Sequence, residues 1–370
     1  MDGDLFAGVM SGTSLDGVDA VIADFSPSSG AACETLGAAH VAYPPLLRDE
    51  LLALQLPGSN ELARAGVAAY MLAEIYAEAI AKALAAASLE PEQVRAAGVH
   101  GQTLRHRPDR GFTFQLNNAA RVVERSGMVV VADFRSRDVA AGGQGAPLVP
   151  AFHAALFARP DSHRVIVNVG GVANITDLPA DGAIHGFDTG PGNVLSDLWC
   201  ARNRGTIFDA EGAWAATGEV DAALLAVLLD DSFFVARPPK STHRDKFDLA
   251  WLEGRLAKAG TSRAPEDVQA TLVALTTRTI ADAIRARAPG ADEILVCGGG
   301  ANNHALMHGL ARELAPRPVA TTAEEGVPVD QVEALAFAWL ARETLAGRPG
   351  NLPSVTGAAG SRVLGAIYPR

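Results

Sequence analysis

The chain is poor in cysteine, in positive charge and in long apolar runs, and each shortage excludes a class of protein. Of its 370 residues three are cysteines, Cys33, Cys200 and Cys297, too far apart for a disulfide framework or a CxxC metal motif. Lys and Arg number 31 against 42 Asp and Glu, and the net charge of -11 opposes nucleic-acid binding. No apolar run reaches about 18 residues, and the start MDGDLF is acidic where a signal peptide is basic. We therefore expect a soluble cytoplasmic protein with no nucleic-acid or membrane partner.

The rest of the composition is ordinary for a globular protein, with 48% hydrophobic and 20% charged residues. At roughly 100–200 residues per domain, the length predicts two domains, with one large domain as the alternative. Two blocks each open with strands joined by glycine-rich turns and continue into helices; they begin at Leu5 and Arg164. We interpret this order as an internal duplication. A single α/β domain with repeated turn chemistry remains the alternative.

The local patterns predict the following elements. Strands are expected at 5–10, 18–25, 96–100, 112–116, 128–134, 164–171, 172–179, 183–193 and 293–297, and helices at about 60–87, 221–229, 266–288, 302–315 and 329–346. The helix at 60–87 rests on an apolar stripe formed by Leu62, Val67, Met71, Ile75, Ile80 and Leu84. The segment 140–150 is predicted to be a loop because its glycines and prolines cannot sustain a helix.

The first glycine-containing turn that suggests chemistry is Ser11–Gly17. Its backbone N–H groups and hydroxyls suit an anion, and glycine permits the close approach of a phosphate. Asp16 and Asp19 are candidate ligands for Mg²⁺ beside such a phosphate, directly or through water. An ordinary polar hairpin turn is the alternative.

Two further turns follow strands in the second block. In Asp188–Asn193 a carboxylate precedes Gly-x-Gly, which makes Asp188 a candidate general base acting where a γ-phosphate would end. In Gly298–Asn303 three glycines join a strand to a helix, so a flat base can lie against bare backbone. Neither segment is a Walker A loop or a GxGxxG motif, which disfavours a Rossmann site. A capped Gly/Pro turn and a compact strand-to-helix turn are the respective alternatives.

In this order the segments GTSLDG, DTGPGN and GGGANN resemble the phosphate-1, phosphate-2 and adenosine motifs of the superfamily of acetate and sugar kinases, heat-shock chaperones and actin. Within it the chain resembles the anhydro-N-acetylmuramic acid kinase family over nearly its whole length, through GVHGQTLRHRP, QLNNAA, VVADFRSRDVAAGGQGAPLVP, NVGGVANIT and VPVDQVEALAFAWLA. One departure is Met10, which stands where the superfamily usually has an acidic residue. The resemblance implies a two-lobed actin-like ATPase fold, an α/β fold of duplicated ribonuclease H-like domains with an interdomain active-site cleft. It implies lobes at 1–135 and 136–349, with the tail at about 350–370 returning to the first.

The resemblance also implies a reaction. The family opens the anhydro bridge of 1,6-anhydro-N-acetylmuramic acid with water and phosphorylates O6 with ATP and Mg²⁺, in cell-wall recycling. Asp188 matches the family's base. The ATP-binding positions that it implies are Gly12, Thr13, Ser14, Leu15, Asp16, Gly17, Val18, Asp19, Gly190, Gly192, Asn193, Gly298, Gly299, Gly300 and Asn302. A homodimer is expected from the same resemblance.

The sugar carries a lactyl carboxylate, for which an arginine is the natural bidentate partner. By carry-over Arg135 is the first candidate and Arg137 the second, with a surface salt bridge as the alternative. The other sugar-site candidates are His100, Gln102, Asn118, Asp133, Gln144 and Glu333. A structural histidine and a solvated helix charge are the alternatives for His100 and Glu333, and no role is assigned to Lys240.

Two other functions compete with this hypothesis. A kinase that acts on an ordinary sugar hydroxyl or a carboxylate would need the three turns, but not the HGQT and DFRSRD segments. A nucleotide-switched binding protein would hydrolyse ATP without a small acceptor and would usually carry a substrate-binding extension.

Overall fold

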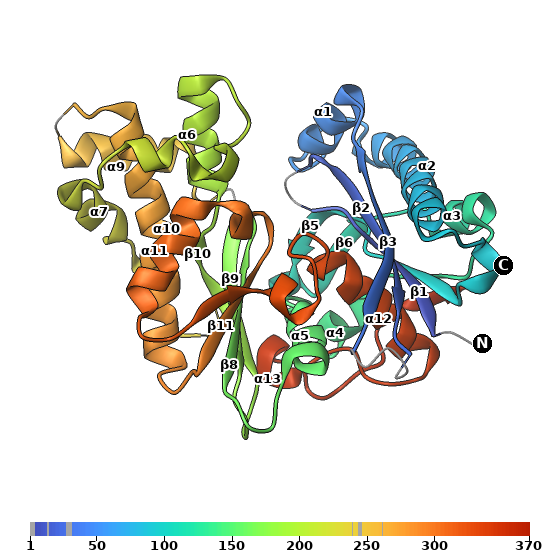
Figure 1. Ribbon diagram of the computed structural model, residues 1–370. Coiled ribbons are helices and arrows are strands. Elements are labelled where there is room, and N and C mark those ends of the chain that lie inside the picture. The colour runs from blue at the N-terminus through green and yellow to red at the C-terminus, as the bar shows by residue number, and fades with distance from the viewer. Residues whose placement is uncertain (1–3, 13–14, 27–31, 239, 243–245, 261) are drawn as a thin grey trace. The chain divides into compact units, whose positions relative to one another are not determined.

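The computed structural model describes residues 4–12, 15–26, 32–238, 240–242, 246–260 and 262–370 (Figure 1). The chain divides into two compact units. Unit 1 consists of Met1–Leu156 and Gln331–Arg370, and unit 2 of Phe157–Asp330. Each unit has its own β-sheet with helices packed on it, so the fold is α/β.

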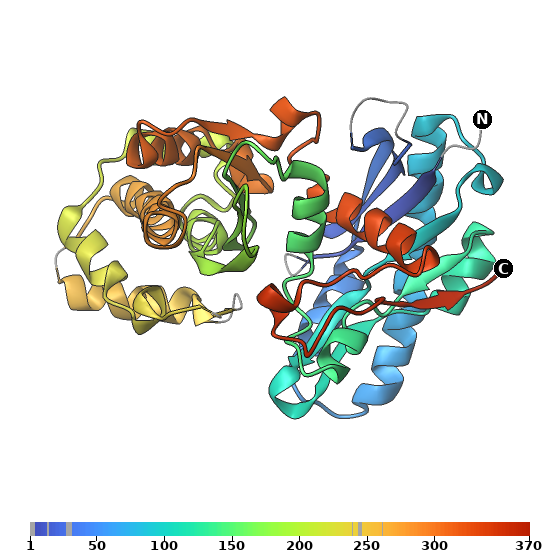
Figure 2. The same ribbon diagram turned by 90° about the horizontal axis from the view of Figure 1, so that it is seen from below.

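Unit 1 is built on a six-stranded sheet in the order β13-β7-β4-β1-β2-β3. Its strands are β1 (Leu5–Met10), β2 (Gly17–Asp24), β3 (Glu34–Ala42), β4 (Ala96–Val99), β7 (Val130–Ala132) and β13 (Ala366–Tyr368). The first three are antiparallel neighbours, whereas β4 and β7 run parallel to β1. The C-terminal strand β13 pairs antiparallel with β7, so the chain's end returns to this sheet (Figure 2). A separate hairpin, β5 (Gln102–Arg107) and β6 (Phe112–Leu116), follows β4.

Helices α2 (Glu61–Ala87), α3 (Ala119–Ser126) and α12 (Val332–Leu345) pack on the unit 1 sheet. The other helices are α1 (Pro45–Ala53), α4 (Ser136–Ala140), α5 (Val149–Phe157) and α13 (Pro353–Thr356). On α2 the buried face carries Leu72, Tyr76 and Ile80, one helical turn apart, and these pack into the same core as β1 and β2 (Figure 1). The expected stripe is wrong at its start, because Leu62 is 89% exposed and Val67 64%.

Helix α12 approaches the sheet so closely that its backbone touches a strand. A Cβ on Gly98 in β4 would come within 2.0 Å of the Phe337 carbonyl oxygen, so only glycine fits there. This contact explains why the division by packing assigns residues 331–349 to unit 1. The family resemblance instead implies that this segment and residues 136–156 belong to the second lobe.

Unit 2 repeats the sheet of unit 1. Its strands are β8 (Arg164–Val169), β9 (Val172–Leu178), β10 (His185–Pro191), β11 (Glu293–Cys297) and β12 (Val319–Thr321), in the order β10-β9-β8-β11-β12. The first three are antiparallel neighbours, and β11 and β12 run parallel to β8. The core of unit 1, β3-β2-β1-β4-β7, has the same order and directions. This ribonuclease H-like arrangement, present twice, confirms the predicted duplication and fold class.

The helices of unit 2 are α6 (Val194–Arg204), α7 (Ala222–Leu229), α8 (Ser232–Val235), α9 (Leu249–Ala259), α10 (Pro265–Arg287) and α11 (His304–Leu314). Short 3₁₀ helices complete the described chain at Pro91–Gln93, Pro108–Arg110, Ala210–Gly212, Ala215–Thr217, Gly299–Asn302 and Thr322–Glu325. Helix α10 lines the sheet core through Ile280, Ala281 and Ile284. Helices α6, α7 and α9 form a second apolar core with the first half of α10.

Candidate functional site

The predicted phosphate-1 turn joins β1 to β2 at one end of the unit 1 sheet. Thr13 and Ser14 lie outside the described residues. Leu15 is buried in the core and holds a left-handed φ of 54°, which costs a non-glycine residue about 1–3 kcal/mol. Gly17 and Val18 are buried at the start of β2, whereas Asp16 and Asp19 are exposed.

A hydrogen-bonded network of buried side chains holds this turn in place. The Gln102 Nε2 donates to the Gly12 carbonyl oxygen at 3.1 Å, and its Oε1 accepts from the Tyr43 hydroxyl at 3.1 Å. The Ser11 Oγ lies 3.0 Å from the Tyr76 hydroxyl of α2. Burial raises the pKa of Tyr43 to about 12, so its hydroxyl keeps its proton as a donor. Gln102, predicted to contact sugar, thus has both ends of its amide bound within the protein.

The two carboxylates proposed for Mg²⁺ differ in their surroundings. One Asp16 oxygen accepts from the N–H of Gly17 at 2.9 Å, and its side chain is exposed. Asp19 instead pairs with Nδ1 of His40 at 2.8 Å. Within the described residues no group of three or more His, Cys, Asp or Glu side chains could hold a metal. Mg²⁺ usually takes only one or two carboxylates together with substrate phosphates, so Asp16 fits such a role, and Asp19 would have to exchange His40 for it.

Asp188 lies in β10, next to an irregularity in its pairing with β9. Its Oδ2 accepts from the backbone N–H of Thr242 at 2.7 Å, and no described group is seen to donate to Oδ1. Burial raises the pKa of Asp188 to about 6, against the lowering effects of the Thr242 N–H and of Lys240. A carboxylate with this pKa is ionised at neutral pH and still accepts a proton readily, as a general base must.

The two other glycine turns of unit 2 meet at the end of β8. The N–H groups of Gly192 and Asn193 donate to the carbonyl oxygens of Gly171 and Gly170, at 2.9 and 2.8 Å. Gly298 has a φ of 79°, and a Cβ there would lie 2.8 Å from the Val169 carbonyl oxygen. Two predicted motifs more than 100 residues apart therefore pack side by side, one on the end of β8 at Val169 and the other on the β8–β9 turn at Gly170 and Gly171.

The remaining ATP candidates of unit 2 lie in β10 and directly after β11. Gly190 is buried in β10, and Gly299 and Gly300 lie in the 3₁₀ helix that follows β11. The Asn302 amide donates to the carboxylate of Asp330, at 3.2 and 3.3 Å. These contacts form within unit 2.

Two of the sugar-site candidates, His100 and Glu333, lie close to Arg135. Its Nε donates to Nε2 of His100 at 3.0 Å, and its Nη1 to the Gly145 carbonyl oxygen at 2.7 Å. No ion pair to Arg135 is found among the described residues. Burial lowers its pKa to about 10, partly offset by Glu333 and Asp138, so it stays charged at neutral pH. A guanidinium whose Nε and Nη1 are bound, and which forms no ion pair with a carboxylate of the described residues, suits an anionic ligand.

His100 accepts from Arg135 through Nε2, whereas its buried Nδ1 has no hydrogen-bond partner among the described residues. Burial and the nearby Arg135 charge hold the pKa of His100 well below its usual value, so the ring is neutral. Because its Nε2 accepts from Arg135, the ring hydrogen must be on Nδ1. His100 therefore positions Arg135 through Nε2, and its Nδ1–H keeps the expected role of a sugar-site donor open.

The glycine-rich loop after α4 is organised by Asp138, which is fully buried. Its Oδ2 accepts from the N–H of Gly145 at 2.7 Å, and its Oδ1 from Asn351 at 2.6 Å and Thr356 at 2.8 Å. Exposed Gln144 lies in this loop and is held by its backbone N–H, which donates to the Thr356 carbonyl oxygen at 2.8 Å. Asp138 thus ties the segment that presents Gln144 to the C-terminal part of unit 1.

Asp133 and Asn118 occupy special backbone positions. Asp133 is exposed, has a φ of 58° and accepts from the Ser136 hydroxyl at 2.5 Å. Asn118 is the N-cap of α3, since its Oδ1 accepts from the N–H of Arg121 at 3.0 Å. In contrast, the buried amide atoms of neighbouring Asn117 have no hydrogen-bond partner among the described residues.

Comparison with known proteins adds a family to this geometry. A family model described as anhydro-N-acetylmuramic acid kinase matches residues 4–370. The chain belongs to this family. Curated relatives named anhydro-N-acetylmuramic acid kinase include one from Thiobacillus denitrificans, 52% identical over 98% of this chain and 97% of its own length. Another, from Cupriavidus pinatubonensis, is 54% identical over 100% of this chain and 99% of its own length. As a member of the anhydro-N-acetylmuramic acid kinase family, the protein is a phosphotransferase.

Several residues of the site carry no signal of their own in this kinase sequence. Tyr43 and Tyr76 act through contacts with residues far away in the chain, and nothing in their local patterns marks them. Asp138 lies within VVADFRSRDVAAGGQGAPLVP, but that segment does not contain its partners Asn351 and Thr356. The Gly170–Gly171 turn did carry a signal, because it lies within NVGGVANIT, one of the segments that carry the resemblance to the family.

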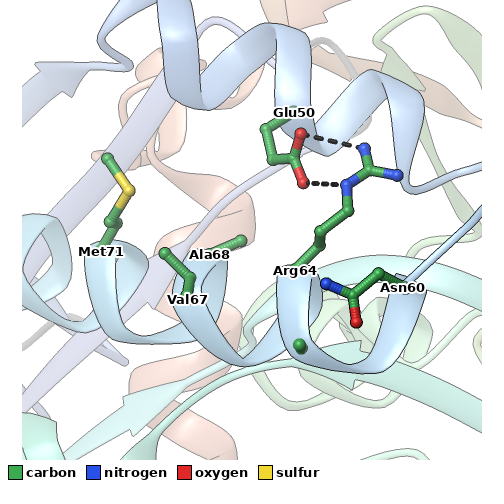
Figure 3. A pocket seen from close by; sticks show the side chains of 7 residues that line it. Glu50, Asn60, Arg64, Val67, Ala68 and Met71 are labelled. Carbon is green, nitrogen blue, oxygen red and sulfur yellow. Dashed lines mark hydrogen bonds and ion pairs between the residues drawn. The ribbon is translucent and has the colours of Figure 1, made fainter.

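A shallow pocket between α1 and α2 lies apart from these residues (Figure 3). It is lined by Glu50, Asn60, Ala63, Arg64, Val67, Ala68 and Met71. The Arg64 guanidinium donates to both oxygens of Glu50, at 2.7 and 2.9 Å, so the main charges at the pocket already neutralise each other.

Within the described part of the chain, no helix is long and apolar enough to cross a bilayer.

Proposed function

We propose that this kinase opens the 1,6-anhydro ring of 1,6-anhydro-N-acetylmuramic acid with water and phosphorylates O6 with ATP. The products are N-acetylmuramic acid 6-phosphate and ADP, as expected of an enzyme of cytoplasmic cell-wall recycling. Family membership supports the substrate. The single observation that carries the mechanism is Asp188, a carboxylate with a pKa of about 6 and only one oxygen hydrogen-bonded within the described residues.

The bonds of the proposed reaction balance with one base. Asp188 takes a proton from water, whose oxygen forms a bond to the anomeric carbon. The bond between that carbon and O6 breaks, and O6 attacks the γ-phosphorus of ATP as the bond to the ADP oxygen breaks. A positioned base contributes about 10²–10⁴-fold to such a step. The rest of the acceleration comes from alignment and charge stabilisation.

Arg135 is the proposed partner of the lactyl carboxylate, and Glu333 approaches it closely enough to raise its pKa. His100 fixes the Arg135 side chain through Nε. Gln144, Asp133 and Asn118 remain proposed sugar contacts, although the Asn118 Oδ1 already caps α3. For Gln102 the contacts favour a role in holding the phosphate-1 turn.

ATP is the proposed phosphate donor, bound by the three glycine turns. Asp16, and Asp19 if it leaves His40, would hold Mg²⁺, which supplies charge neutralisation at the phosphates when bound. The assembly is proposed to be a homodimer.

The test is mass spectrometry of the sugar after incubation with the protein, ATP and Mg²⁺ in ¹⁸O-water. We expect a product heavier by one phosphoryl group and one water, with ¹⁸O on the anomeric carbon. Asp188→Asn should abolish it. The control is Asp177→Asn, since Asp177 lies on the neighbouring strand β9 and pairs with His163. Hydrolysis of ATP with unchanged sugar would refute the substrate assignment and favour a nucleotide-switched binding protein.

A further inference from the structure

The segment Lys240–Thr242, to which the proposed reaction gives no role, lies along the edge of the strand that carries Asp188. β10 is the outermost strand of its sheet among those described, so no strand satisfies its outer backbone groups. The N–H of Asp188 donates instead to the Lys240 carbonyl oxygen at 3.2 Å. Two residues further on, the N–H of Thr242 donates to Asp188 Oδ2 at 2.7 Å. The segment therefore binds both the backbone and the carboxylate of one residue.

The Lys240 side chain anchors this segment to α8. Its ammonium donates to the carbonyl oxygens of Phe233 and Phe234, at 3.0 and 3.3 Å. The same nitrogen lies 4.6 Å from the ring centroid of Phe233 and 5.9 Å from that of Phe187, which precedes Asp188 in β10. An ammonium has three donors and two are used here, so the side chain is well fixed.

Charge also links the segment to the carboxylate. Burial lowers the pKa of Lys240, and the positive charges of Arg287 and Lys246 lower it further, whereas Asp188 raises it. In return, Lys240 and the Thr242 N–H oppose the effect of burial on Asp188. Both favour the ionised carboxylate, the form that can accept a proton.

The geometry points to Lys240 and Thr242 as positioning residues for Asp188. The Thr242 N–H occupies Oδ2 and so directs Oδ1 to the water, while Lys240 fixes the segment on α8 and keeps the carboxylate ionised. The inference rests on the proposed role of Asp188 as the base. Neither residue needs to touch the sugar or ATP for this role.

The first measurement follows the Asp188 carboxyl directly, by ¹³C NMR titration of protein labelled at aspartate side chains. Its resonance is identified by its absence from Asp188→Asn. We expect Lys240→Met to move its titration midpoint to higher pH and Lys240→Arg to restore it. Lys246→Met is the matched control, because the Lys246 ammonium also lies 4.6 Å from the Phe233 ring centroid but pairs with Asp231. An unmoved midpoint in Lys240→Met overturns the inference.

The second measurement is the pH profile of kcat/KM for the anhydro sugar. In Lys240→Met we expect a loss of about tenfold near pH 5.5 and of about threefold or less near pH 8, since removing a nearby positive charge raises a carboxyl pKa. Thr242→Pro, which removes the N–H, should shift the profile likewise, and Thr242→Val, which keeps it, should not. An equal loss at every pH would indicate damage to the fold and contradict the inference. A moved NMR midpoint in a protein that leaves the sugar unchanged would support the positioning role and refute the proposed function alone.

Discussion

At the scale of single residues, ionised Asp188, the proposed base, lowers the stability of the fold. Its pKa is 3.8 in a model peptide and about 6 in the folded chain, so the native state binds the proton more tightly than the unfolded state. Stability is therefore lost as pH rises from about 4 to about 6, and the cost persists at neutral pH.

Asp188→Asn removes this cost, because an amide does not ionise. At neutral pH we expect the free energy of unfolding to rise by about 1–3 kcal/mol. The rise is reduced by the weakening of the hydrogen bond that the Thr242 N–H donates to this side chain. Below about pH 4 the difference should disappear. Urea unfolding of both proteins across this pH range measures it. A variant less stable than wild type at neutral pH would show that the carboxylate supports the fold.

At the scale of elements, the turn between β1 and β2 shows that local sequence patterns predict a turn better than the distant contacts that support it. The alternation in β2 and the glycines of the turn indicate a hairpin, and the structure has one. The hydroxyl of Tyr76 meets Ser11 from 65 positions away, and no short pattern contains that contact. For the same reason β3 and α1 were missed, since the alanine-rich segment 34–42 becomes a strand through its pairing with β2.

The contacts of the phosphate-1 turn distinguish two roles of Gln102, which are support of the turn and contact with the sugar. If its amide holds the turn through Gly12, Gln102→Met should raise the KM for ATP about tenfold, as expected for one lost hydrogen bond of about 1.5 kcal/mol, and change the KM for the sugar less. Gln115→Met is the matched control, because Gln115 lies on the paired strand β6 and bonds only to Thr113 and Thr103 among the described residues. Steady-state kinetics with each substrate varied distinguishes the two roles. A rise confined to the KM for the sugar would instead support the contact expected from the resemblance.

At the scale of the whole molecule, the duplication could be predicted from the sequence, because both copies begin with strands and glycine turns in the same order. The bounds of each unit were harder to predict. Periodicity indicates a helix near 329–346 but does not show which sheet it packs on. The helix α12 packs on the unit 1 sheet because it contacts Gly8 and Gly98, the glycines of two distant strands. Unit 2 is thus inserted in the sequence of unit 1, whose sheet acquires α12 and β13 only after residue 330.

This insertion predicts an asymmetric response to truncation. A chain that ends at Asp330 keeps every strand and helix of unit 2 but loses α12, whose Leu335, Phe337 and Leu340 are almost fully buried in unit 1. Losing three such side chains forfeits about 5–9 kcal/mol of apolar burial, comparable to the whole stability of a typical domain. We expect fast hydrogen exchange at β1, β2 and β4, and retained protection at β8, β9 and β11, by mass spectrometry against the full chain. Equal loss of protection in both units would contradict this prediction, because it would mean that unit 2 does not hold its fold without a complete unit 1.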